Sequence, residues 1–169
     1  MNDELTITPE AIPAGRRRSV YASTKLLHEW SLLQPWDEPP KYELRLGPTP
    51  ASISNPSLTP VEQRMVRVAN RYADLVGPIG NELLVVEAKM DADPGAQSQL
   101  LHYVDLLSTT PYFDAHRDKR IVPVLLFAAN DPVVTQRAVA AGIRVEHFAP
   151  DWAREWFVKR YSTKHRIGF

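Results

Sequence analysis

Glu87 and Lys89 follow an apolar run at residues 83–86 that is typical of a buried strand. Charged side chains are seldom buried unless they are paired or coordinate something. Because side chains alternate along a strand, Glu87 and Lys89 share one face and lie about 7 Å apart along it. A carboxylate and an ammonium at one end of a hydrophobic strand suit metal-assisted chemistry on a phosphate.

A second carboxylate, Asp74, lies on a strand predicted at residues 73–76, and a turn at 77–81 makes the two strands a hairpin. Neighbouring strands can place Asp74 beside Glu87, and a divalent cation would relieve the repulsion between the two carboxylates. The chain has no cysteine and its histidines show no metal-ligand spacing, so these oxygen ligands favour Mg²⁺ or Mn²⁺ over zinc. Lys89 could then position the attacking water or offset charge that develops on a phosphate.

Gln99 and Tyr103 lie four residues apart on a helix that Asp93 and Pro94 are predicted to open. Both have polar tips on one helical face, from which they could reach a bound phosphate, the attacking water or a base. A half-buried tyrosine beside a surface glutamine would explain the same pattern without any function. Both interpretations stay open from these residues alone.

The order Asp74, Glu87-Ala88-Lys89, Gln99-x-x-x-Tyr103 resembles the PD-(D/E)XK nuclease superfamily, whose core is a mixed sheet flanked by helices in the order αβββαβ. The Gln-x-x-x-Tyr element is similar to the subset that includes RecB-type nucleases. Residues 70–150 look most like the nuclease domain of the NucS mismatch endonucleases. The resemblance implies the following metal ligands and catalytic or auxiliary residues: Asp74, Glu87 and the main-chain carbonyl of Ala88 on the metal, Lys89 as the catalytic lysine, and Gln99 and Tyr103 near the substrate.

Some members of the superfamily add a metal-binding glutamate from the first core helix. Glu29 and Glu62 are the candidates, but Glu62 is explained by a capping box that begins at Thr59, so Glu29 is the further candidate. This chain has Ala73, where the family motif has a proline, immediately before Asp74.

The elements that must position these residues predict an α/β fold with a restriction-endonuclease-like core. Apolar periodicity, capping residues and turn residues predict ten elements in addition to the connecting loop at 47–58. Strand and helix alternate in the second half, which predicts some parallel pairing. The predicted elements are helix 23–33, strand 41–46, helix 59–72, strand 73–76, strand 82–90, a helix from 93, strand 121–128, a helix from 130 to Gly142, strand 143–148 and helix 151–159.

Most of the 15 prolines lie in the first 60 residues, which predicts a loop-rich segment. We therefore divide the chain into a proline-rich N-terminal arm at 1–58, with one short helix and one strand that could join the core, and a nuclease-like domain at 59–169. Composition is that of an ordinary globular protein, and no apolar stretch approaches the roughly 20 residues of a membrane span.

The net charge of zero weighs against a protein whose whole surface binds nucleic acid. The first hypothesis is a Mg²⁺- or Mn²⁺-dependent DNA endonuclease in the cytoplasm, where the absence of a signal peptide places it by default. The alternative is a structural or docking protein of a large assembly, for example a phage head–tail or neck component in the virion, with a vestigial site. A resolvase-like homodimer is a third reading, and protein partners could bind through the N-terminal arm. No membrane partner is expected.

Overall fold

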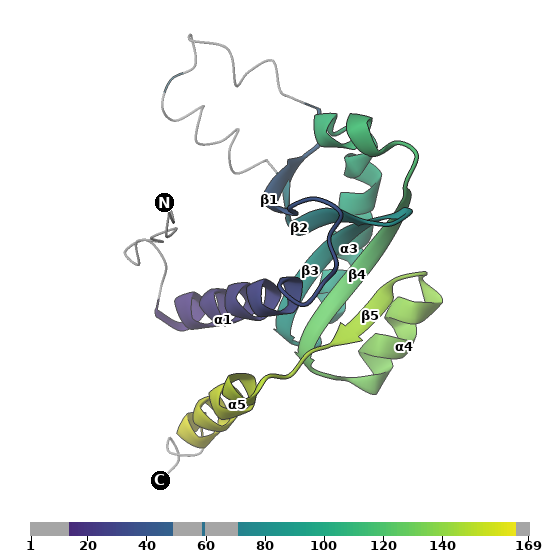
Figure 1. Cartoon of the computed structure of the whole chain (residues 1–169). Helices are drawn as coiled ribbons and strands as arrows, with labels where there is room; N and C mark the ends of the chain where they lie inside the picture. The colour runs from purple at the N-terminus through teal and green to yellow at the C-terminus, as the bar shows by residue number, and fades with distance from the viewer. Residues whose placement is uncertain (1–13, 49–58, 60–70, 165–169) are drawn as a thin grey trace.

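The computed structural model describes residues 14–48, 59 and 71–164, and its elements follow one another along the chain as Figure 1 shows. Apart from the 3₁₀ helix η3, the described elements from α1 to β4 follow the order α-β-β-β-α-β that the resemblance implies. The elements are α1 (Ala14–Ser31), β1 (Lys41–Leu46), β2 (Arg71–Ile79), β3 (Glu82–Asp91), α3 (Pro94–Leu107), the 3₁₀ helix η3 (Pro111–His116), β4 (Arg120–Ala129), α4 (Pro132–Ala140), β5 (Arg144–His147) and α5 (Asp151–Lys164).

The five strands form one mixed sheet in the order β1-β2-β3-β4-β5. β1, β2 and β3 pair antiparallel, whereas β3, β4 and β5 pair parallel. The predicted hairpin is confirmed, with its turn at Gly80 and Asn81, and Gly80 takes the positive φ of 55° that glycine adopts without strain. The strand predicted at 41–46 joins the sheet through β2.

Helices cover both faces of the sheet. Leu26 and Trp30 of α1 pack with Val86 on one face, where α5 also contributes Ala153. Leu100 of α3 packs with Val85 on the opposite face, together with residues of α4. Because β3 is covered on both faces, its apolar residues form a continuous run and do not alternate with polar ones.

The helix starts follow the predicted capping residues. Asp93 accepts a hydrogen bond from the Gly95 amide at the start of α3, and Asp131 does the same for Val133 at the start of α4. The helix predicted at 23–33 is longer at its start and begins at Ala14, since no proline interrupts the chain there. The last helix likewise continues past residue 159 to Lys164.

Part of the predicted N-terminal arm belongs to the packed fold, because α1 and β1 lie on the sheet. The rest of the arm, the loop at 49–58 and most of the helix predicted at 59–72 lie outside the described residues, so the boundary at residue 58 stays a prediction. The prediction is wrong at residues 71 and 72, which begin β2. Among the helices that the structure describes, none is long and apolar enough to cross a membrane.

Candidate active site

Asp74 lies where β2 loses regular pairing with both of its neighbours. β1 and β2 pair from Lys41–Val76 to Leu46–Arg71, and the missing rung is the one that would join Glu43 to Asp74. β2 and β3 pair from Ile79–Glu82 only as far as Leu75–Val86 within the described residues. One step further in that register, Asp74 stands opposite Glu87, as the sequence predicts.

The Asp74 side chain takes over a hydrogen bond that main-chain pairing would otherwise use. Its Oδ2 accepts from the amide of Ala88 at 2.9 Å. The N–H and C=O of one strand residue point to the same side of the strand. The Ala88 carbonyl therefore points toward β2, beside the Asp74 carboxylate, where the family resemblance implies a main-chain ligand.

Glu87 is the buried member of the site. The residue is 1 % exposed, and its Oε1 lies 2.5 Å from the Lys89 ammonium. Its other oxygen, Oε2, is buried, and no donor among the described residues bonds to it. A hydrogen bond from the protonated Glu87 carboxyl to Asp74 is among the causes that raise the Glu87 pKa, so only the ionised form lacks this contact. Buried carboxylate oxygens almost always have a partner, because an unsatisfied one carries the full cost of desolvation. A hard cation bound at Oε2 would remove that deficit, so the donors present fit Mg²⁺ or Mn²⁺.

The electrostatics of the site are those of two carboxylates that compete for one cation. Burial, followed by the charge of Asp74, raises the pKa of Glu87 from 4.5 to about 7. Burial also raises the pKa of Asp74, although the Ala88 hydrogen bond and Lys89 oppose the rise. Burial lowers the pKa of Lys89, but the charge and hydrogen bond of Glu87 outweigh it and the net change is upward. Lys89 is therefore a cation at neutral pH, and its side chain is 30 % exposed.

Gln99 and Tyr103 form a pair on α3, as their spacing predicts. The Gln99 amide donates to the Tyr103 hydroxyl oxygen through a short hydrogen bond. Tyr103 is 4 % exposed and packs in the core that α3 shares with β3. Burial raises the pKa of Tyr103, the Gln99 bond lowers it, and the charges of Glu87 and Asp74 raise it. The ring is thus part of the core, while the hydroxyl lies within the electric field of the carboxylate pair.

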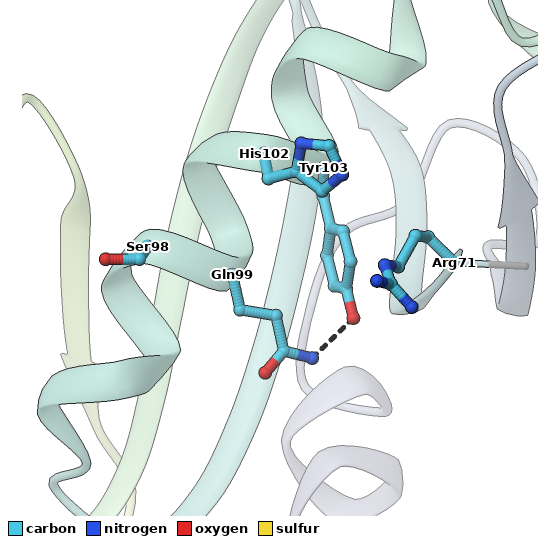
Figure 2. Close-up of a pocket in the computed structure, with 5 residues that line it drawn as sticks. All are labelled: Arg71, Ser98, Gln99, His102 and Tyr103. Carbon is cyan, nitrogen blue, oxygen red and sulfur yellow. Dashed lines mark hydrogen bonds between the residues drawn. The ribbon is translucent and has the colours of Figure 1, made fainter. Parts of the chain in front are cut away.

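A pocket of about 400 Å³ opens beside this pair. Figure 2 shows the Tyr103 hydroxyl and the Arg71 guanidinium in the same hollow, with the Gln99 amide bonded to the hydroxyl. Its lining consists of Arg71 from β2 and four residues of α3: Ser98, Gln99, His102 and Tyr103.

Glu29, the further metal-ligand candidate, makes its contacts elsewhere. Its Oε2 accepts from the Trp152 indole at 2.7 Å, and its Oε1 lies 3.8 Å from the Lys25 ammonium. α1 packs on the sheet face of Val86 and Ala88, whereas Glu87 alternates to the other face. The structure therefore does not bring Glu29 to Asp74 and Glu87. Glu62, the rival candidate, lies outside the described residues.

Glu43 is a neighbour of the site that the sequence reasoning missed. It lies at the interrupted rung of β1 opposite Asp74, and its charge is one of the causes that raise the Asp74 pKa. Its φ of 48° falls in the left-handed region, which is strained for a residue other than glycine. The signal that could have found it is the register between β1 and β2: β1 is an edge strand of the sheet, and Glu43 is the one carboxylate in its sequence.

No group of three or more His, Asp or Glu side chains within residues 14–48, 59 and 71–164 is arranged to hold a metal ion. The candidate metal site accordingly rests on two carboxylates, Asp74 and Glu87, and on the Ala88 carbonyl. In comparisons with family models, with curated proteins and with solved structures, no match to this chain was found. The site is therefore argued from its own geometry.

Proposed function

We propose that the protein is a divalent-metal-dependent DNA endonuclease of the PD-(D/E)XK type. The observation that carries the proposal is the state of Glu87: a carboxylate buried beside Asp74 and Lys89, with one oxygen lacking a partner among the described residues. A carboxylate that served only as an ion-pair partner would gain nothing from an unsatisfied oxygen. Perturbed carboxylates of this kind are concentrated at functional sites.

Asp74, Glu87 and the Ala88 carbonyl would hold Mg²⁺ or Mn²⁺. When bound, such an ion acts as a Lewis acid on a phosphoryl oxygen and lowers the pKa of a coordinated water. Asp74 is oriented for this role by the Ala88 amide. The Glu87 carboxylate is held by the Lys89 ammonium on one oxygen, which leaves Oε2 for a ligand.

Lys89 acts as a cation and hydrogen-bond donor in this proposal, because its raised pKa keeps it protonated. An ammonium that is partly exposed beside a buried carboxylate can contact both the water that attacks and the phosphate oxygen that gains charge. Tyr103 and Gln99 lie on the same side of the sheet and offer neutral donors for substrate oxygens.

The test is divalent-dependent cleavage of plasmid, linear and branched DNA by the purified full chain. We expect Asp74→Asn and Lys89→Ala to lower the cleavage rate by about 100-fold or more, the usual cost of removing one electrostatic contact to the reacting group. Arg154→Ala, at an exposed position on α5, is the matched control and is expected to cleave like the natural protein. Cleavage that survives both site substitutions would overturn the assignment.

One observation favours a second candidate, a docking protein with a vestigial site. Large apolar side chains are exposed in the middle of α1, directly after its end and on α5, namely Tyr21, Leu32, Leu33, Val158 and Tyr161. Exposed apolar side chains are available for contact with a protein partner. Stable assembly into a defined oligomer, together with no Mn²⁺ binding and no cleavage of any DNA, would favour this candidate. Placement in the cytoplasm or in a virion follows from whichever candidate holds.

A further inference from the structure

The pocket between β2 and α3 has the chemistry of an anion site. Its lining carries one permanent positive charge, Arg71, and hydrogen-bonding side chains from Ser98, Gln99, His102 and Tyr103. No carboxylate lines it, although Asp74 lies three residues after Arg71 on the same strand. The pocket is therefore locally positive beside a locally negative site.

Arg71 differs from those arginines near the sheet that pair with carboxylates, and also from Arg45 of β1, which hydrogen-bonds the main-chain oxygens of Gly47 and Pro48. Arg120 and Arg144 both pair with Glu82, and Arg117 pairs with Asp114. Arg71 is exposed and has no ion pair with a carboxylate among the residues that the structure describes. A guanidinium presents donors in a planar fork that matches a phosphate or carboxylate. Figure 2 shows this fork turned into the pocket toward the Tyr103 hydroxyl.

The Gln99–Tyr103 pair leaves donors available on the opposite wall. The Tyr103 oxygen accepts one hydrogen from the Gln99 amide, which keeps the phenolic O–H free to donate. The amide nitrogen carries a second hydrogen that this bond does not use. Because Tyr103 is buried and fixed by the core, its hydroxyl has a defined position. The pocket thus offers a charged fork on one side and oriented neutral donors on the other.

We propose that this pocket binds a phosphate group of the DNA next to the phosphate that is cut, with Arg71 as a substrate-positioning residue. The inference rests on the proposed nuclease function, because that function places the cut phosphate at Glu87 and Lys89. A neighbouring phosphate held at Arg71 would fix the register of the strand relative to Asp74. The phosphate can come from two sources, an internal phosphodiester or a terminal phosphate monoester, and the shared chemistry is a phosphate oxyanion.

The binding test uses fluorescently labelled DNA with Ca²⁺ in place of Mg²⁺, measured by anisotropy from about 50 to 200 mM salt, the range over which phosphate contacts weaken strongly. We expect Arg71→Ala to weaken binding about tenfold at the low-salt end. The slope of log K against log salt should fall by about one, the signature of a lost phosphate contact. Arg71→Lys should keep the slope and recover part of the affinity. Arg137→Ala, at an exposed position on α4, is the matched control for loss of one positive charge.

Two DNA substrates distinguish the sources of the phosphate. One duplex carries 5′ and 3′ terminal phosphates and the other carries none. If the effect of Arg71→Ala is the same on both, the pocket holds an internal phosphodiester; if it disappears without terminal phosphates, the pocket holds a monoester. Either outcome supports the pocket as a phosphate site, and an effect no larger than that of Arg137→Ala on both substrates overturns it.

The two proposals fail in different ways. DNA cleavage that depends on Asp74 and Lys89 but is unaffected by Arg71→Ala, with an unchanged salt slope, would overturn the phosphate pocket and leave the nuclease assignment standing. Arg71-dependent DNA binding without any metal-dependent cleavage would keep the pocket and overturn the nuclease assignment. In an active enzyme, Arg71→Ala should raise KM more than it lowers kcat, because its contact is made in the bound ground state as well as in the transition state.

Discussion

Replacing Glu87 with glutamine removes a charge that the folded protein holds at a cost. The pKa of Glu87 is raised from 4.5 to about 7, chiefly because the carboxylate is buried. At about 1.36 kcal/mol for each pKa unit, this rise corresponds to about 3 kcal/mol of unfolding free energy. Because the pKa of Glu87 is higher in the folded chain than in the unfolded one, protonated Glu87 contributes this stability in full below pH 4.5. The contribution is lost as the pH rises through 7.

The expected result is a change in the pH dependence of stability. In EDTA, the unfolding free energy of the natural protein should fall by about 3 kcal/mol, relative to that of Glu87→Gln, between pH 4.5 and pH 8. Urea denaturation followed by tryptophan fluorescence at several pH values measures this difference. Glu155→Gln, at an exposed position on α5, is the matched control and should show the pH profile of the natural protein.

Parallel stability profiles for the natural protein and Glu87→Gln would refute the reasoning. They would mean that Glu87 ionises as easily in the folded chain as in the unfolded one, through its contact with Lys89. The argument for a cation at the unpartnered oxygen would then lose its basis. The same variant should cleave no DNA, and that loss should not be explained by unfolding, since Glu87→Gln is expected to be the more stable protein at pH 8.

Three further predictions concern the same structure. Mg²⁺ or Mn²⁺ at about 100 times its Kd should stabilise the natural protein by about 2.7 kcal/mol, and thermal melting should show a rise in Tm that Asp74→Asn lacks. Tyr103→Phe should lower kcat/KM about tenfold while changing stability by less than about 1.5 kcal/mol, the worth of one hydrogen bond; unchanged cleavage would leave Tyr103 a core residue only. Gly77→Ala should lower the unfolding free energy by about 1–3 kcal/mol in urea denaturation, because the added carbon would lie 2.7 Å from Pro40 and 2.9 Å from Trp36. Gly95→Ala, whose added carbon meets its nearest atom at 3.2 Å, is the control and should cost less.

The order of elements could be predicted because local signals and packing agree along this chain. The apolar run at 83–86 is continuous because helices cover both faces of β3, and its interpretation as a buried strand is confirmed. Asp93 and Asp131 each precede a proline, and both cap the helices predicted to follow them. The hairpin itself could be predicted, but its register could not, since register follows from the turn. The turn predicted at 77–81 is only Gly80 and Asn81, and β2 continues through 77–79, which places Asp74 opposite Glu87.

The parts that could not be predicted depend on where elements meet in space. Glu29 was proposed from the family pattern, but the face that α1 buries decides its neighbours, and those are Trp152 and Lys25. Glu43 carries no sequence signal for a left-handed backbone, because that conformation results from the interrupted rung with β2. Arg71 becomes notable only when β2 is packed beside α3.

Three irregularities of the structure occur at one place, and together they favour the proposed functional site over a structural ion pair. The missing rung at Asp74, the strained backbone of Glu43 and the unpartnered oxygen of Glu87 are neighbours across three strands. Each costs stability, and an ordinary salt bridge needs none of them. Ala88 shows what the arrangement achieves: its amide donates to Asp74, and its carbonyl, on the same side of β3, points toward β2 beside that carboxylate. Regular pairing through this point would satisfy the backbone and close the site, so in the proposed nuclease the interruption would leave the space for a cation and a phosphate.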